Sequence, residues 1–179
     1  MREDIASILL SEEQIHTRVR ELGAEISRDY AGKEPLFVGV LKGCFIFMAD
    51  LFREVTIHSS VDFMAVSSYG NGTSTTGAVK INKDLSQDIE NRDVIIVEDI
   101  LDSGITLSYL TKYLQNRKPS SICIATLLDK PARRRADVQA KYVGFTVPDA
   151  FVVGYGLDYA EKYRNLPFIG VLKPEVYEK

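Results

Sequence analysis

The sequence predicts an α/β fold, a parallel twisted sheet flanked by helices. Short apolar runs of strand length recur along the chain, and segments with helical periodicity lie between them. Several of these runs are apolar throughout, which is typical of strands buried on both faces of a parallel sheet. The chain has 179 residues, enough for a real core, so we expect a single domain over residues 1–179.

The first predicted element is a helix over residues 12–31. Ser11 and Gln14 form a capping box, and apolar residues follow at helical spacing. Further helices are expected over residues 44–52 and 105–114. Apolar runs or alternating patterns predict strands over residues 36–41, 61–67, 94–97, 121–128, 142–145, 151–153 and 168–172.

Residues 70–77 differ in kind, because they consist only of Gly, Ser, Thr and Asn and cannot contribute to a core. The segment is too short for a linker between domains. We therefore expect a mobile loop at the tip of a hairpin, with residues 79–82 as the returning strand.

Composition narrows the class of protein. The net charge of −3, from 22 basic and 25 acidic residues, does not favour nucleic-acid binding. No apolar run reaches membrane-spanning length, and the N-terminal residues do not resemble a signal peptide. Cys44 and Cys123 lie in apolar runs, which favours buried free thiols over a disulfide or metal site, and hence a cytoplasmic protein.

Residues 94–106, VIIVEDILDSGIT, carry the strongest chemical signal. A buried strand is followed by Glu98 and Asp99, and then by a turn that leads into a helix. A helix N-terminus offers free backbone N–H groups and the positive end of a dipole, so it binds phosphate readily. Gly104 allows an anion to approach the backbone, and the hydroxyls of Ser103 and Thr106 add donors.

The acids in this segment repel phosphate, so the ligand must also carry something that prefers carboxylates. Ribose hydroxyls, a divalent cation or a proton to be abstracted all qualify, and a sugar phosphate bound with Mg²⁺ satisfies both halves of the motif. One alternative is that Asp102 and Ser103 merely cap the helix, but this leaves Glu98 and Asp99 unexplained. A nucleotide hydrolase is a second alternative, and the sequence lacks the glycine-rich lysine loop that it requires.

The sequence resembles the hypoxanthine-guanine phosphoribosyltransferases, the 6-oxopurine salvage enzymes. The segments that carry the resemblance are VIIVEDILDSGIT, LKG at 41–43, SY at 68–69 with the following Gly/Ser/Thr stretch, LLDK at 127–130, FVVGYGLDY at 151–159 and YRNLP at 163–167. The resemblance implies a type I phosphoribosyltransferase core at about 33–145, with a flexible hairpin lid at about 68–78. It also implies a small C-terminal hood, formed by the N-terminal segment and residues from about 150 to 179.

The resemblance also implies roles on the sugar-phosphate side. Glu98 and Asp99 would hold the ribose hydroxyls and Mg²⁺, and Asp102 would move the proton at purine N7 as a general acid or base. The backbone of residues 103–106 would hold the 5′-phosphate, although Ile105 stands where some relatives have a basic residue. Residues implied to contact pyrophosphate are Lys42, Gly43, Ser68, Tyr69 and Arg164.

On the acceptor side, Lys130 would donate to the purine 6-oxo group and so reject adenine, which carries an amino donor there. Phe151 would stack on the base, the Val152 backbone would read its edge, and Asp158 would contribute to the purine site and to Mg²⁺ binding. The metal set is thus Glu98, Asp99 and Asp158.

The resemblance further implies small-molecule substrates and a homodimer or homotetramer. The basic run at residues 130–135 is expected at a subunit interface or on the surface. Two alternatives remain open from the sequence. One is a non-catalytic regulator that senses phosphoribosyl pyrophosphate or a nucleotide, and the other is a transferase that prefers xanthine.

Overall fold

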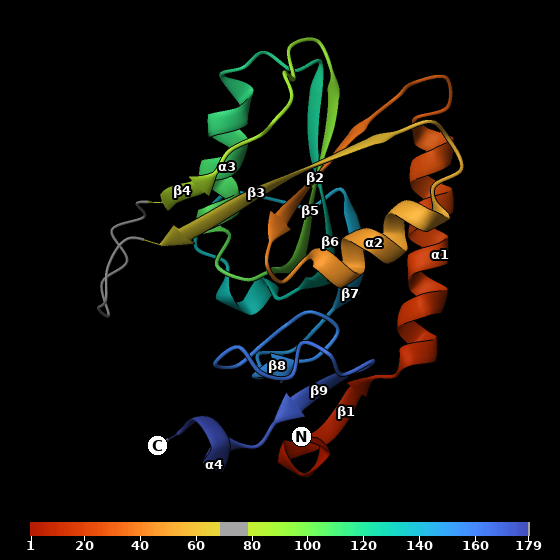
Figure 1. The fold of residues 1–179 in the computed structure, drawn as a ribbon. Helices are drawn as coiled ribbons and strands as arrows, with labels where there is room; N and C mark the ends of the chain where they lie inside the picture. The colour runs from red at the N-terminus through yellow and green to blue at the C-terminus, as the bar shows by residue number, and fades with distance from the viewer. Residues whose placement is uncertain (69–78, 179) are drawn as a thin grey trace.

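The computed structural model describes residues 1–68 and 79–178, which form a core sheet and a smaller second sheet (Figure 1). The core sheet is six-stranded, in the order β4–β3–β2–β5–β6–β7. Its strands are β2 (Leu36–Leu41), β3 (Ser60–Ser68), β4 (Val79–Lys83), β5 (Asp93–Leu101), β6 (Ser121–Asp129) and β7 (Tyr142–Thr146). Neighbouring strands are parallel from β3 to β7, while β4 lies antiparallel to β3 at the edge. The predicted α/β class is confirmed, with a mixed rather than a purely parallel sheet.

Helices cover both faces of this sheet. α1 (Glu12–Asp29) and α2 (Phe45–Glu54) pack on one face and α3 (Ile105–Gln115) on the other (Figure 1). Successive strand residues alternate between the two cores: Phe37 and Ile95 lie under α1 and α2, whereas Val38 and Ile96 lie under α3. This two-sided burial is the reason for the continuous apolar runs of β2 and of residues 94–97 in β5.

The predicted capping box at the start of α1 is present. The Ser11 hydroxyl accepts a hydrogen bond from the Gln14 backbone N–H at 3.2 Å, and the Gln14 side chain accepts one from the Ser11 N–H at 2.9 Å. Both cysteines are free thiols, as predicted; Cys44 is buried and Cys123 is partly buried. Across residues 1–68 and 79–178, none of the helices combines the length and the apolar character needed to span a membrane.

The second sheet contains β1 (Ile5–Leu10), β8 (Val152–Val153) and β9 (Ile169–Leu172). We use the name hood for this sheet together with the loop of residues 154–168. Its strand order is β1–β9–β8, all antiparallel. The N-terminal strand therefore pairs with a strand near the C-terminus, and both chain ends lie in this part of the molecule (Figure 1). The short α4 (Pro174–Tyr177) follows β9.

Two strand predictions needed correction. β1 was not predicted, because the polar residues around it mask its alternation and its partner lies at the other end of the sequence. β5 continues four residues past the predicted end at Val97, to Leu101, because its backbone keeps pairing with β6 where its side chains turn polar. Glu98 and Asp99 thus lie inside the strand rather than after it.

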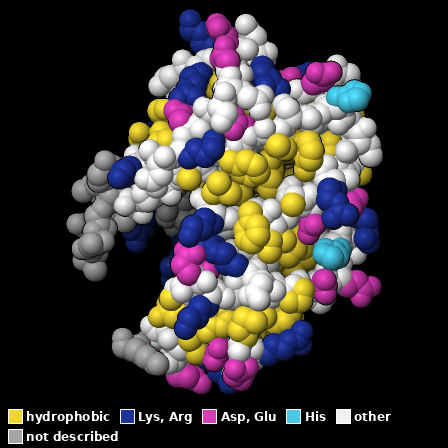
Figure 2. All heavy atoms as spheres, viewed as in Figure 1, with side chains coloured by type: hydrophobic (Ala, Val, Ile, Leu, Met, Phe, Trp, Pro, Cys, Tyr) yellow, Lys and Arg dark blue, Asp and Glu magenta, His cyan; other side chains and the backbone are white. Residues whose placement is uncertain are grey.

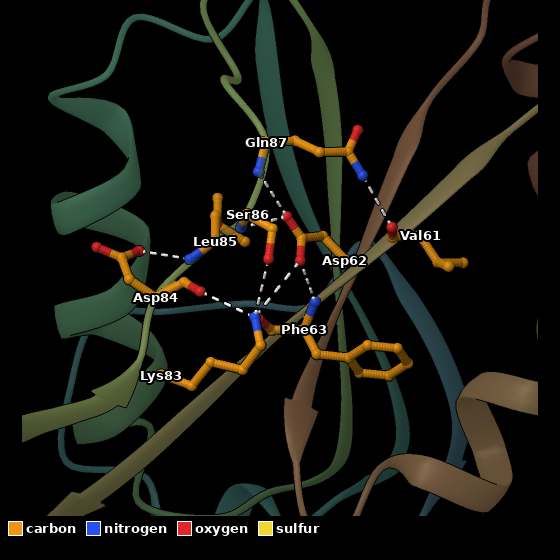
Figure 3. A network of polar contacts seen from close by, with 8 residues as sticks. All are labelled: Val61, Asp62, Phe63, Lys83, Asp84, Leu85, Ser86 and Gln87. Atoms are coloured by element: carbon orange, nitrogen blue, oxygen red, sulfur yellow. Dashed lines mark hydrogen bonds and ion pairs between the residues drawn. The ribbon is translucent and has the colours of Figure 1, made fainter.

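A polar network fixes the edge of the core sheet (Figure 3). The buried Asp62 carboxylate, 6 % exposed, accepts the backbone N–H groups of Ser86 and Gln87 at 2.8 and 3.0 Å. Lys83 lies 3.7 Å from the same carboxylate and donates to the Phe63 carbonyl oxygen at 2.9 Å. These contacts hold the end of β4 against β3. The pairing of the two strands in turn fixes the position of Ser68 at the other end of β3.

Candidate active site

A cleft of about 380 Å³ lies at the carboxyl ends of β2, β3 and β5, where ligands bind in parallel α/β sheets. Predicted site residues that line it are Lys42, Gly43, Ser68, Glu98, Asp99, Asp102, Ser103, Gly104, Thr106, Asp158 and Arg164. The cleft also lies between the core and the hood, since Asp158 and Arg164 come from the hood loop. Figure 2 shows basic and acidic side chains side by side at this junction.

The turn before α3 has the geometry of a phosphate loop. Gly104 is the N-cap, and its φ of +79° belongs to the left-handed region that favours glycine. A Cβ there would lie 2.4 Å from the Val138 side chain. Among the described residues no side chain caps this helix, and Ser103 makes only a long 3.4 Å contact with the Ile105 N–H. The first amides of α3 are therefore available to an anion.

Glu98 and Asp99 form a partly buried acid pair on one wall of the cleft. The Glu98 carboxylate accepts the Asp99 N–H at 3.1 Å, and the Asp99 carboxylate accepts the Ile100 N–H at 2.8 Å. Burial, reinforced by the adjacent Asp99 charge, raises the pKa of Glu98 well above its usual value. Two neighbouring carboxylates of this kind are stabilised by a cation or by hydroxyl donors from a ligand.

Gly43 lies against this acid pair. A Cβ on Gly43 would lie 1.8 Å from Asp99 Oδ2, closer than any real contact. From the hood, Gly156 approaches equally closely, since a Cβ there would lie 2.2 Å from the Gly43 carbonyl oxygen. Only glycine at both positions lets the hood loop, residue 43 and the Asp99 carboxylate come together.

Asp102 lies at the centre of the cleft, between the acid pair and the phosphate loop. Its Oδ1 atom is buried and has no hydrogen-bond partner within the part of the chain that the structure describes. A buried carboxylate oxygen without a hydrogen-bond partner lowers the stability of the folded protein. A ligand group that donates a proton or a hydrogen bond to Asp102 would remove that cost.

The cations of the cleft are already engaged with acids. Lys42 Nζ lies 3.0 Å from Glu161 Oε2, and Arg164 Nη2 lies 3.0 Å from Asp158 Oδ1 and 3.3 Å from Glu161 Oε1. The hydrogen bond from Lys42 is the main cause that lowers the pKa of Glu161. Glu161 thus bridges the two cations at the mouth of the cleft, where an anionic ligand would compete with it.

Of the predicted acceptor residues, Asp158 lines this cleft, whereas Lys130, Phe151 and Val152 do not. Lys130 is buried, 5 % exposed, and donates to the Ala150 carbonyl oxygen at 2.9 Å. Phe151 is 38 % exposed and stacks on Tyr177, with ring centroids 4.6 Å apart, and Val152 is buried in β8. Ile105 borders a neighbouring hollow on the outer side of the phosphate loop. Tyr69, with the predicted lid apart from Ser68, lies outside the described residues.

The sequence did not indicate several residues that organise the site. Glu161 and Tyr177 contact residues far along the chain, and Arg134 contacts the Asp102 backbone and the Asp129 carboxylate. Glu161 lies three residues before Arg164, and this spacing of an acid and a base is a local sequence pattern that could have indicated their ion pair.

Comparisons with known proteins agree with this geometry. The family model described as phosphoribosyl transferase domain matches residues 6–160. The hypoxanthine-guanine phosphoribosyltransferase of Bacillus subtilis (strain 168) is 60 % identical over 178 residues, 99 % of each chain. That of Staphylococcus aureus (strain Mu50) is 58 % identical over 177 residues, 99 % of each chain. A crystal structure of a hypoxanthine phosphoribosyltransferase from Staphylococcus aureus superimposes with a TM-score of 0.97 at 57 % identity, covering 100 % of this chain and 97 % of that one.

A doubly covered α/β sheet with a phosphate loop and an acid pair at its carboxyl edge defines the class of phosphoribosyl-binding transferases. The chain belongs to the phosphoribosyltransferase family, and within it to the hypoxanthine-guanine phosphoribosyltransferases.

Proposed function

We propose that this chain transfers 5-phosphoribose from phosphoribosyl pyrophosphate to hypoxanthine or guanine, giving IMP or GMP and pyrophosphate in purine salvage. The observation that carries the proposal is the single cleft that joins a phosphate loop, the acid pair, Asp102 and the two cations Lys42 and Arg164. The relatives described above are hypoxanthine-guanine enzymes, which favours this activity over a regulator or a xanthine-preferring transferase.

The sugar phosphate has a matching surface along β5 and α3. The free amides of residues 103–106 and the hydroxyls of Ser103 and Thr106 suit the 5′-phosphate. Glu98 and Asp99 line the same cleft and would accept the ribose hydroxyls. The pyrophosphate would then lie towards Lys42, Gly43, Ser68 and Arg164, with Tyr69 as a further predicted contact. There it would displace Glu161 from the two cations.

Magnesium fits the residues on this side. Glu98, Asp99 and Asp158 offer the oxygen ligands that Mg²⁺ prefers, and the raised pKa of Glu98 marks a place where a cation relieves repulsion. Within residues 1–68 and 79–178 no three His, Cys, Asp or Glu side chains lie together in a way that could hold a metal ion. Glu98, Asp99 and Asp158 would therefore bind Mg²⁺ only together with substrate phosphates and water, which commonly complete the coordination of this ion. When bound, it would neutralise charge on the leaving pyrophosphate.

In the reaction a bond forms between purine N9 and the anomeric carbon. The bond from that carbon to pyrophosphate breaks, its electron pair leaves with the pyrophosphate, and the base gives up one proton. Asp102, with a buried oxygen that lacks a partner, is the group placed to hold a proton at N7.

The purine would lie towards the hood. The Lys130 ammonium has three protons, and the Ala150 carbonyl oxygen takes one of them, so the cation has donors left for a 6-oxo group. Phe151 is exposed enough to offer ring surface to a base, and Val152 follows it in β8. Tyr177 covers part of the Phe151 ring in this structure, so either the base uses the other face or Tyr177 moves aside.

The test is a direct assay of nucleotide formation. The chain is incubated with phosphoribosyl pyrophosphate, Mg²⁺ and, in turn, hypoxanthine, guanine, xanthine, adenine and uracil. We expect product with hypoxanthine and guanine, none with uracil, and loss of turnover when EDTA removes the metal. Turnover with xanthine alone, or with none of the bases, would contradict the proposal.

The cellular setting and the assembly belong to the same proposal. The free thiols of Cys44 and Cys123 suit the reducing cytoplasm. A homodimer or homotetramer is the assembly that we expect, and sedimentation at micromolar concentration would test it.

Gly43→Ala should lower kcat/KM for phosphoribosyl pyrophosphate by about a hundredfold, the scale of a 1 Å displacement in an active site. The new Cβ cannot occupy its ideal position beside Asp99 Oδ2, so the Asp99 carboxylate or the loop has to shift. Steady-state kinetics with varied phosphoribosyl pyrophosphate measures the loss.

The control is Gly32→Ala, because no atom lies within 4 Å of the ideal Cβ of Gly32, although this glycine, unlike Gly43, has a positive φ of +78°. It should lose some stability and keep wild-type kinetics. Equal activity in the two variants would show that the close approach at Gly43 is unimportant.

A further inference from the structure

The basic run Arg133–Arg135 divides into side chains with different surroundings. Arg133 is exposed and forms a surface ion pair with Asp149 at 2.7 Å. The side chain of Arg135 is also exposed. Arg134 turns inward, with its side chain 20 % exposed, so the expectation of a solvated surface patch is wrong for this residue, and the expectation of an interface stays a prediction.

The Arg134 guanidinium joins three separate segments. Nε donates to the Asp102 carbonyl oxygen at 3.1 Å, Nη1 donates to the Val138 carbonyl oxygen at 2.9 Å, and Nη2 donates to the Asp129 carboxylate. Asp129 ends β6 and directly precedes Lys130, and its side chain is only 21 % exposed. The Arg134 side chain therefore links the backbone of Asp102, the predicted proton-transfer residue, to Asp129, the residue before the predicted base-recognition lysine Lys130.

The backbone around Arg134 strengthens this link. The Ser103 carbonyl oxygen accepts the N–H groups of Arg135 and Ala136 at 2.8 and 3.2 Å. The Arg134 Cδ atom also lies 3.0 Å from the position that a Cβ on Gly104 would take, so the side chain packs directly against the phosphate loop. Residues 134–138 thus pack along the outer side of the phosphate loop, and the Arg134 side chain contributes to this packing.

We propose that Arg134 is a positioning residue that holds Asp102 and the phosphate loop in the geometry that the transfer requires. The inference rests on the proposed function. Arg134 borders the hollow on the outer side of the phosphate loop and is absent from the lining of the cleft, so its proposed action runs through the Asp102 carbonyl oxygen. Arginine suits this role because its rigid, planar fork donates in three directions at once, which a lysine ammonium on a flexible stem cannot reproduce.

The experiment compares Arg134→Gln and Arg134→Lys with Arg135→Gln, a matched control that alters the neighbouring exposed side chain and keeps its backbone hydrogen bond. We expect kcat to fall by about a hundredfold in Arg134→Gln, the scale of a small misplacement of a catalytic group. Arg134→Lys should recover only part of this loss, and Arg135→Gln should match the wild type.

A readout besides activity separates positioning from a general loss of structure. Hydrogen exchange followed by mass spectrometry should show faster exchange in the peptide that covers residues 102–106 of Arg134→Gln, with protection of β2 and β6 unchanged. In an Asp102→Asn background, Arg134→Gln should lose most of its effect on kcat, because both changes act on the same group.

Arg134→Gln leaves the Asp129 carboxylate without its partner, so the single variant is prone to unfold. The double variant Asp129→Asn/Arg134→Gln removes both charges and tests the same point with a balanced site. Wild-type kcat in a folded Arg134 variant, or an equal loss in the Asp102→Asn background, would overturn the proposal. If the wild-type chain itself makes no nucleotide, the proposed function fails instead, and the two failures are distinct.

Discussion

Asp102→Asn is expected to lower kcat by about ten- to a thousandfold, the usual contribution of a general acid or base. The amide keeps the shape of the side chain but cannot take up or release the proton at N7. KM for phosphoribosyl pyrophosphate should change little, because the backbone amides that suit the 5′-phosphate stay in place. Single-turnover and steady-state measurements of IMP formation give both quantities.

The fold should tolerate this change. Asp102 carries a buried oxygen that has no partner among the described residues, and a neutral amide is easier to bury than such a carboxylate. Asp137→Asn is the control, since Asp137 is an exposed aspartate that does not line the cleft. Unchanged turnover in a folded Asp102→Asn protein would remove Asp102 from the mechanism.

Lys130→Met is expected to lower kcat/KM for hypoxanthine by about ten- to 150-fold, since a hydrogen bond from a charged donor contributes about 1.5–3 kcal/mol. Methionine has a similar length and can be buried, but it donates no hydrogen bond to the 6-oxo group. The effect should fall on KM for the base and leave KM for phosphoribosyl pyrophosphate within a few-fold of the wild type. Separate titration of each substrate makes the distinction.

Some loss of stability should accompany Lys130→Met, because the Ala150 carbonyl oxygen loses its donor from Lys130. Lys112→Met, at an exposed position on α3, serves as the control and should leave both KM values unchanged. An unaltered KM for hypoxanthine in Lys130→Met would place the recognition of the 6-oxo group elsewhere.

Local patterns predicted most of the core sheet and the sugar-phosphate side of the site. The capping box of α1, the apolar run of β2 and the phosphate loop each depend on residues that are neighbours in sequence, so single segments reveal them. The acid pair was also recognised, although its strand proved longer than its apolar run.

The features that sequence reasoning missed depend on contacts between remote segments. β1 owes its strand conformation to β9 at the other end of the chain, and Lys42 meets Glu161 across 119 residues. Arg134 lay within a basic run that suggested a solvated face, and its inward turn depends on the Asp129 carboxylate and on backbone oxygens. Lys130 and Phe151 were predicted as acceptor residues from family resemblance and not from any local pattern, and this assignment stays a prediction.

The pairing of β1 with β9 has a consequence for how the protein is made. Every strand of the core sheet has its neighbours once synthesis has passed Thr146, but β1 stays without a partner until Ile169–Leu172 has left the ribosome. Pairing across nearly the whole chain is also slow, because the loop that it closes is long. The hood sheet, which contains the predicted purine-binding residue Val152, is therefore completed after the core sheet, and β1 is paired late although it precedes every core strand in the sequence.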